Sequence, residues 1–222
     1  MIDWSALLLS FEVAFAGTLV ALIVGVSIAG LLSTSRSLAR DFIDALVTAP
    51  LVVPPTVLGY YVLVVLGRNS PVGRAWESLT GSPIVFTVTG VVVAAFLGAL
   101  PLIVKSSRAA MEQVDPRLIG AARTLGAGPL RVFLTVVLPL ARSGVAGGAA
   151  LGFARALGDF GVTLMVAGNI SGVTRTASLS IYDAVMGGRD SDANGLAALM
   201  AGLAIAALTI ANRLTRRSHD VR

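Results

Sequence analysis

The sequence predicts an all-α integral membrane protein with five transmembrane helices. Of its 222 residues, 55% are hydrophobic and only 13% are charged, about half the charged fraction of a typical soluble domain. Several apolar runs are long enough to cross a bilayer core of roughly 30 Å, which takes about 20 helical residues. Lys and Arg gather in alternate connections between these runs, a distribution typical of membrane proteins, whose cytoplasmic loops are rich in both.

Four of the expected spans are plain in the sequence. The runs 13–32, 45–67 and 83–104 contain no charged residue, and a fourth run, 193–212, lies near the C-terminus. Backbone polar groups in lipid must be satisfied within the segment, so each run is expected to be helical.

Two further segments are less regular. The segment 138–160 is apolar and rich in small residues but contains Arg142, Arg155 and Asp159; we count it as the remaining span. The run 160–174 is weaker, short and interrupted by glycines. It is expected to be re-entrant or interfacial, a possible short sixth membrane segment.

The basic residues predict the orientation, because the side richer in Arg and Lys is cytoplasmic. Alternating five spans places on one side Arg36, Arg40, Lys105, Arg108, Arg117, Arg123, Arg131, Arg213, Arg216, Arg217 and Arg222. The other side receives Arg68, Arg74, Arg175 and Arg189. We therefore expect the N-terminus outside and the C-terminus in the cytoplasm. Residues 1–222 then form a single transmembrane domain, with a cytoplasmic loop at about 105–138 and an outer loop at about 161–192.

Several functions are excluded or disfavoured. There is no cysteine and one histidine, His219 in the polar tail, so neither a catalytic constellation nor a metal site is expected. No Gly-x-x-x-x-Gly-Lys-Ser/Thr motif for ATP is present. The net charge of +5 is attributed to cytoplasmic loops rather than to nucleic-acid binding. We expect a chain that is not an enzyme and binds no cofactor.

The second run contains Pro50, Pro54 and Pro55. Proline removes a backbone donor and kinks helices, and broken helices at membrane depth are tolerated where they face protein or a water-filled cavity. The bend is either a packing kink or part of a pathway lining, two compatible interpretations. Pro54, Pro55 and the adjacent Thr56 are candidate translocation-path residues.

Small residues recur along the segment 138–160 as Gly144-x-x-x-Gly148-x-x-x-Gly152. Such spacing lets membrane helices approach closely. The pattern is compatible with packing inside the chain or with a dimer seam.

The cytoplasmic loop is expected to contain a short helix. Asp115 is a good N-cap, Pro116 suits the first helical position, and Gly126 is a natural stop. A helix of about ten residues is marginal in water by itself. Leu118, Ala122 and Leu125 are expected on one face, which either enters a groove on a partner or lies against the bundle or the lipid surface.

This loop resembles the signature loop of the ABC importer permeases. The family pattern is Glu-Ala-Ala, three residues, Gly, nine residues, Ile, one residue, Leu-Pro. The sequence here reads Ala121-Ala122, three residues, Gly126, nine residues, Val136, one residue, Leu138-Pro139. Gly120 replaces the glutamate of the family, so docking is expected to depend on shape more than on charge.

Further stretches resemble the molybdate branch of that family. They are 50–59, 122–128, 131–135, 138–140, 153–161, 167–170 and 176–185. Sulfate and tungstate permeases are close relatives and remain alternatives. A secondary transporter driven by an ion gradient is a different class, but no internal repeat is evident, and Asp159 is the only acid well inside an apolar run.

The resemblance implies an inner-membrane subunit that moves its substrate by alternating access. It implies a homodimer with the path at its two-fold axis, two ATPase subunits that hold ATP and Mg on the cytoplasmic side, and an external oxyanion-binding protein. The residues expected to couple to the ATPase are Leu118, Gly120, Ala121, Ala122, Leu125, Gly126, Leu138 and Pro139.

Arg155 and Asp159 lie four residues apart and can pair on one helix face. Ionisable groups in a span are costly and often functional. One hypothesis is that Arg155 attracts an oxyanion toward the path while Asp159 holds it in place. The other is a structural ion pair that fixes the end of the helix.

Overall fold

The computed structural model describes residues 3–33 and 37–217, with side chains up to residue 209. Arg36, His219 and Arg222 lie outside this part of the chain, as do the side chains of Arg213, Arg216 and Arg217. The described elements are all helical: α1 (Trp4–Ser33), α2 (Leu38–Val52), α3 (Pro55–Leu66), α4 (Pro71–Thr80), α5 (Val88–Glu112), α6 (Pro116–Thr124), α7 (Pro129–Val132), the π-helical segment η1 (Phe133–Val137), α8 (Leu138–Leu157), α9 (Gly161–Ala167), α10 (Ala177–Met186) and α11 (Asp190–Arg217).

Four helical segments in the described part are long and apolar enough to cross a membrane. They are α1, α5, the continuous stretch Pro129–Leu157 that ends in α8, and Asp190–Thr209 of α11. The pair α2 and α3 gives a fifth span if it is counted as one. The prediction of five spans is confirmed on that count, and the second span is bent at its prolines, as the sequence predicts.

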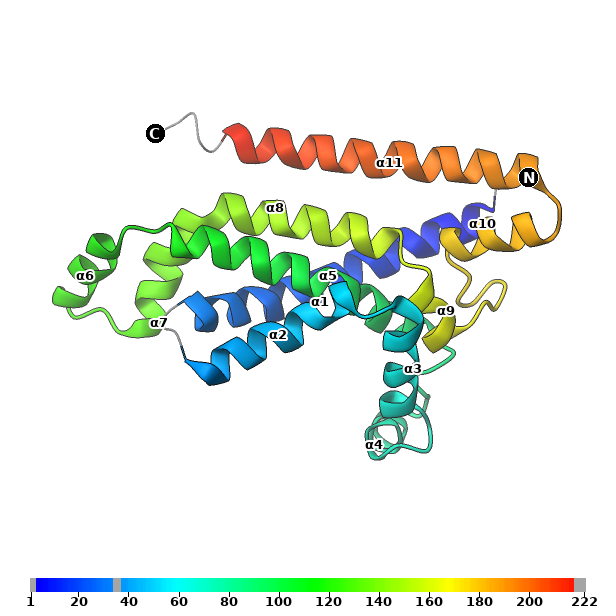
Figure 1. Cartoon of the computed structure of the whole chain (residues 1–222), viewed down its shortest axis with the longest axis horizontal. Helices are drawn as coiled ribbons and strands as arrows, with labels where there is room; N and C mark the ends of the chain where they lie inside the picture. Colours follow the sequence, from blue (N-terminus) through cyan, green and yellow to red (C-terminus); the bar gives the residue numbers. More distant parts are fainter. Residues whose placement is uncertain (1–2, 34–36, 218–222) are drawn as a thin grey trace.

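The break has a local cause. The two helices α2 and α3 meet at an angle of 118°. Pro54 lies between them and Pro55 occupies the first turn of α3, where its missing N–H costs nothing. Pro50, by contrast, lies inside α2 without ending it. The proline pair therefore makes the bend, and α3 leaves the bundle as an arm that carries α4 (Figure 1).

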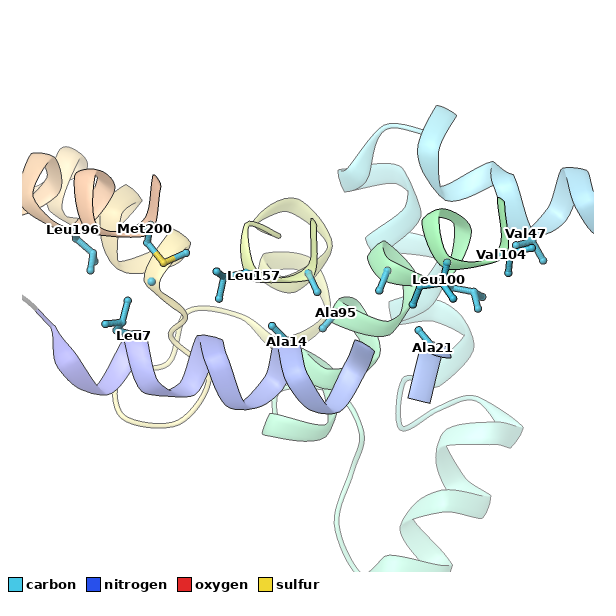
Figure 2. Packing of buried hydrophobic residues seen from close by; sticks show 14 of the residues in the cluster. Leu7, Ala14, Ala21, Val47, Ala95, Leu100, Val104, Leu157, Leu196 and Met200 are labelled. Atoms are coloured by element: carbon cyan, nitrogen blue, oxygen red, sulfur yellow. The ribbon is translucent and has the colours of Figure 1, made fainter. Parts of the chain in front are cut away.

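The centre of the bundle is made by α1, α5 and α8 packed at short range. Ala14, Ala21 and Ala99 have no exposed surface. In Figure 2, Leu7, Ala14 and Ala21 of α1 point toward side chains of α5, α8 and α11. Lipid offers no hydrophobic drive for helix association, so close packing of small residues supplies much of the attraction.

The glycine row of α8 belongs to this centre. A Cβ on Gly148 would lie 2.9 Å from the Cβ of Ser106 on α5, and one on Gly152 would lie 3.1 Å from Ile103. The Ser106 hydroxyl donates a hydrogen bond to the carbonyl of Gly144 at 2.8 Å. Of the two interpretations of this row, the structure uses it for packing inside the chain.

The weaker run 160–174 is not a span. It forms the short helix α9 and a turn that leads to α10, and α9 packs against α3 and α5. Its residues Val162 and Val166 are buried. Next to it, α10 is tied to α1 because the N–H of Ala177 donates to the hydroxyl of Ser10 at 2.7 Å.

The two ends of the bundle carry different elements (Figure 1). At one end lie α6, α7 and the last described turns of α11. At the other end lie the start of α1, with α9 and α10. The predicted cytoplasmic and outer loops thus occupy opposite ends of the molecule.

Replacing Gly17 of α1 by alanine is expected to lower the melting temperature of the detergent-solubilised protein. The added Cβ would lie 2.6 Å from the Cβ of Ala95 and 2.8 Å from the backbone nitrogen of Phe96. Overpacking of this kind costs about 1–3 kcal/mol. Gly195→Ala on α11, where a Cβ meets no atom within 4 Å, is the control and should not destabilise. Equal melting temperatures for both variants would contradict the packing described.

Candidate functional site

The loop helix α6 begins and ends where the sequence predicts. The Asp115 carboxylate accepts a hydrogen bond from the backbone N–H of Arg117 at 2.8 Å, and Pro116 is the first helical residue. The helix ends at Thr124, and Gly126 follows with φ of +81°, a conformation that glycine adopts without strain. These caps hold a nine-residue helix that would be marginal alone.

Two faces of α6 have different surroundings. Ile119 and Ala122 pack partly against a buried cluster that includes Met111, Val132 and Val137. Ala122 is half-buried, at the boundary between this packed face and the face that carries Leu118 and Leu125, since it lies four residues from Leu118 and three from Leu125.

The open face of α6 consists of Leu118, Ala121 and Leu125. The side chains of Leu118 and Leu125 are 49% and 88% exposed, and Ala121 is exposed as well. Gly120 lies beside them with open space around its Cα. Large apolar side chains this exposed, at the arginine-rich end of the helix bundle, form a small surface suited to binding a partner.

The buried cluster that α6 packs against continues to the start of α8. Leu138 packs partly against that cluster, while the next residue, Pro139, is exposed. The π-helical segment η1 precedes them without a break in the helix. Proline cannot donate to the carbonyl four residues earlier, and a π-turn is one way to absorb such a defect. A displacement of α6 would therefore reach α8 through packed side chains.

The candidate path residues of the bend lie near the other end of α8. Pro54, Pro55 and Thr56 are exposed, and Pro55 packs against Gly161 at the start of α9, where a Cβ would lie 2.7 Å from the Cβ of Pro55. Gly59, one turn further along α3, lies against α9 in the same way. The structure thus brings the bend into contact with the segment that follows Asp159.

Arg155 and Asp159 form the ion pair that their spacing predicts. The guanidinium Nη1 of Arg155 lies 3.1 Å from Oδ1 of Asp159. The second oxygen, Oδ2, accepts from both the N–H and the hydroxyl of Thr163, at 3.0 and 2.8 Å. The carboxylate side chain is 2% exposed, whereas that of Arg155 is 34% exposed. Asp159 thus fastens α9 to the end of α8.

Sequence reasoning missed the third member of this group. Thr163 completes the carboxylate's hydrogen bonds, and Gly98 of α5 leaves room beside the Arg155 side chain. Asp159 immediately precedes Phe160, the N-cap of α9, and its Oδ2 satisfies the free N–H of Thr163 in the first turn, so an acid just before a helix start could have indicated Thr163. Gly98 carried no such signal, because its neighbour comes from a distant segment.

Comparison with known proteins identifies the family. Residues 17–219 match the model for the inner membrane component of binding-protein-dependent transport systems. The chain belongs to this family. It is therefore a multi-pass inner membrane protein and a non-enzymatic component of a binding-protein-dependent transport complex.

Curated relatives extend over most of the chain. It is 44% identical over 183 residues to the molybdenum transport system permease protein ModB of Azotobacter vinelandii, covering 82% of this chain and 81% of the relative. It is 39% identical over 219 residues to ModB of Escherichia coli K12, covering 98% of this chain and 96% of the relative.

Solved structures share the fold at low sequence identity. An inward-facing MetNI methionine ABC transporter aligns with a TM-score of 0.71 at 18% identity, over 96% of this chain and 93% of that chain. A bacterial alginate ABC importer aligns with a TM-score of 0.73 at 15% identity, over 96% and 78%. The arrangement of helices is thus that of ABC importer membrane subunits.

The Asp159→Ala variant is expected to lose about 2–3 kcal/mol of stability, because it removes the hydrogen bonds to Thr163 and leaves Arg155 without its carboxylate. The control is Glu77→Ala, which breaks the Arg68–Glu77 pair at 2.9 Å, where the two side chains are 64% and 34% exposed. Such pairs contribute at most about 1 kcal/mol. Thermal unfolding of the two purified variants checks the difference; equal losses would show that Asp159 is not a structural anchor.

Proposed function

We propose that this chain is the membrane-spanning subunit of an ABC importer that moves molybdate across the inner membrane by alternating access. Separate ATPase subunits bind ATP and Mg and drive the movement. The observation that carries this proposal is the similarity to molybdenum permeases, 39% identical over 98% of the chain in one case. It extends over the spans as well as the loop, as expected when the whole pathway serves one substrate.

Coupling to the ATPase takes place on α6. The exposed Leu118, Ala121 and Leu125 fit a groove on the ATPase, as an amphipathic helix does when it binds by its apolar face. Gly120 offers no carboxylate at the signature position, so the contact depends on shape. Movement of α6 then passes through the cluster around Met111 to η1 and α8.

The proposed orientation has α6 in the cytoplasm, the N-terminus outside and the C-terminus inside. The support is the excess of Arg and Lys at the α6 end. Two copies form a homodimer around the path, and the arm of α3, with exposed Tyr60, Tyr61 and Val64, offers an apolar face for that assembly. An oxyanion-binding protein delivers the substrate at the opposite end, near α9 and α10.

Within the path, Arg155 and Asp159 have different roles. Both oxygens of Asp159 are occupied by Arg155 and Thr163, so Asp159 positions the turn between α8 and α9. Arg155 is partly exposed and has further N–H groups beyond the one that faces Asp159. Those groups allow Arg155 to attract an oxyanion toward the bend at Pro54 and Pro55.

Leu125→Asp is expected to abolish co-purification of the ATPase subunits, because a carboxylate would replace the most exposed apolar side chain of α6. Leu79→Asp is the matched control: this leucine is 86% exposed on α4, away from the α6 end of the bundle (Figure 1). A pull-down with each variant and the ATPase makes the comparison. Unchanged recovery with Leu125→Asp would exclude this face as the coupling surface, and failure of the wild type to recover any ATPase would favour a transporter driven by an ion gradient.

An uptake assay on the complete importer in proteoliposomes tests which oxyanion the importer transports. Molybdate uptake is expected to be competed by tungstate, a tetrahedral dianion of nearly the same size, and poorly by sulfate, which is smaller. The control omits ATP, which should stop uptake altogether. Stronger competition by sulfate than by tungstate would assign the chain to sulfate transport instead.

A further inference from the structure

An open apolar groove lies between α1 and the start of α8, apart from the open face of α6 and from the Arg155–Asp159 pair, and it includes Leu138 and Pro139 of the expected coupling residues. It has a volume of about 520 Å³, within the range of about 300–1,000 Å³ typical of ligand sites. Apart from Arg142, its lining residues are all apolar: Leu22, Leu134, Leu138, Pro139, Val145, Ala146 and Ala149.

Arg142 has no partner of its own in the described part of the chain. It is exposed, and no hydrogen bond or ion pair joins it to another described residue. The neighbouring cations on α5 are neutralised: Lys105 lies 2.7 Å from Asp44, and Arg108 lies 2.7 Å from Glu112. The arginine beside the groove therefore has a charge that the described protein leaves unmatched.

Contacts with α5 establish the depth of Arg142. Two residues further along α8, the carbonyl of Gly144 accepts from Ser106, and a Cβ on Gly144 would touch the Cβ of Ala110. Two helical residues span about 3 Å, so Arg142 is level with the charged end of α5, past the apolar run 83–104. Ala146 and Ala149 extend the groove from that level toward the middle of the span.

We propose that this groove binds an anionic phospholipid of the inner leaflet, with the phosphate on Arg142 and an acyl chain along Ala146 and Ala149. A guanidinium pairs with phosphate through two parallel hydrogen bonds. Basic pockets between spans on the cytoplasmic side suit anionic lipid headgroups. A hydrated oxyanion substrate fits poorly, because no lining residue other than Arg142 has a polar side chain to replace its water.

Native mass spectrometry of the delipidated full-length permease with its ATPase tests this site. Added phosphatidylglycerol is expected to bind the wild type at about one molecule per permease chain, and phosphatidylcholine more weakly. Arg142→Gln should weaken phosphatidylglycerol binding by about tenfold, as expected for loss of a charged hydrogen bond. Ala146→Trp, which fills the groove and keeps the charge, should also weaken it.

Arg74→Gln is the matched control, since this exposed arginine on α4 lies far from the groove and the substitution removes the same charge. It should bind phosphatidylglycerol as the wild type does. The proposal is overturned if Arg142→Gln retains wild-type binding, if both lipids bind equally, or if inorganic phosphate displaces the lipid. It is also overturned if Arg142→Gln splits the permease into smaller oligomers, because the groove would then be an interface between copies.

Discussion

The close approach of α1, α5 and α8 underlies every other feature of the molecule. Lipid chains are as apolar as leucine, so these helices gain little from burying large side chains and much from fitting small ones together. Gly17, Gly148 and Gly152 each face another helix at a distance that leaves no room for a Cβ without displacement. This fit defines a rigid body to which the moving parts are attached.

The mobile elements proposed for transport are attached at the two ends of that body. At one end, α6 packs one face on the bundle and leaves the other open. A partner can therefore bind the open face, and a movement of α6 is transmitted to the bundle through the packed face. At the other end, Asp159 fastens α9 to α8, and α9 in turn meets the bend at Pro55. A tilt of the body formed by α1, α5 and α8 would therefore act on both ends at once, as the proposed alternating access requires.

The charges in the spans follow a common rule. Asp159 is buried but satisfied by Arg155 and Thr163, and Asp44 is matched by Lys105 and Arg108. Burial of an unpaired charge is costly, and Arg142, which like Glu12 of α1 has no partner among the described residues, is exposed. Its place beside an apolar groove connects the protein to its lipid environment.

Local rules were enough to specify the class of protein, the number of spans and the limits of the loop helix. An apolar run must be helical in lipid, Asp115 and Pro116 start a helix, and Gly126 ends one. The family, too, could be recognised from the sequence of the loop and of the later stretches. The partner of the glycine row on α5, the space that Gly98 leaves beside Arg155 and the packing of Ala122 against the bundle emerged from the folded chain alone. These features depend on contacts between segments far apart in the chain, and no local pattern in one segment specifies which face of another it will meet.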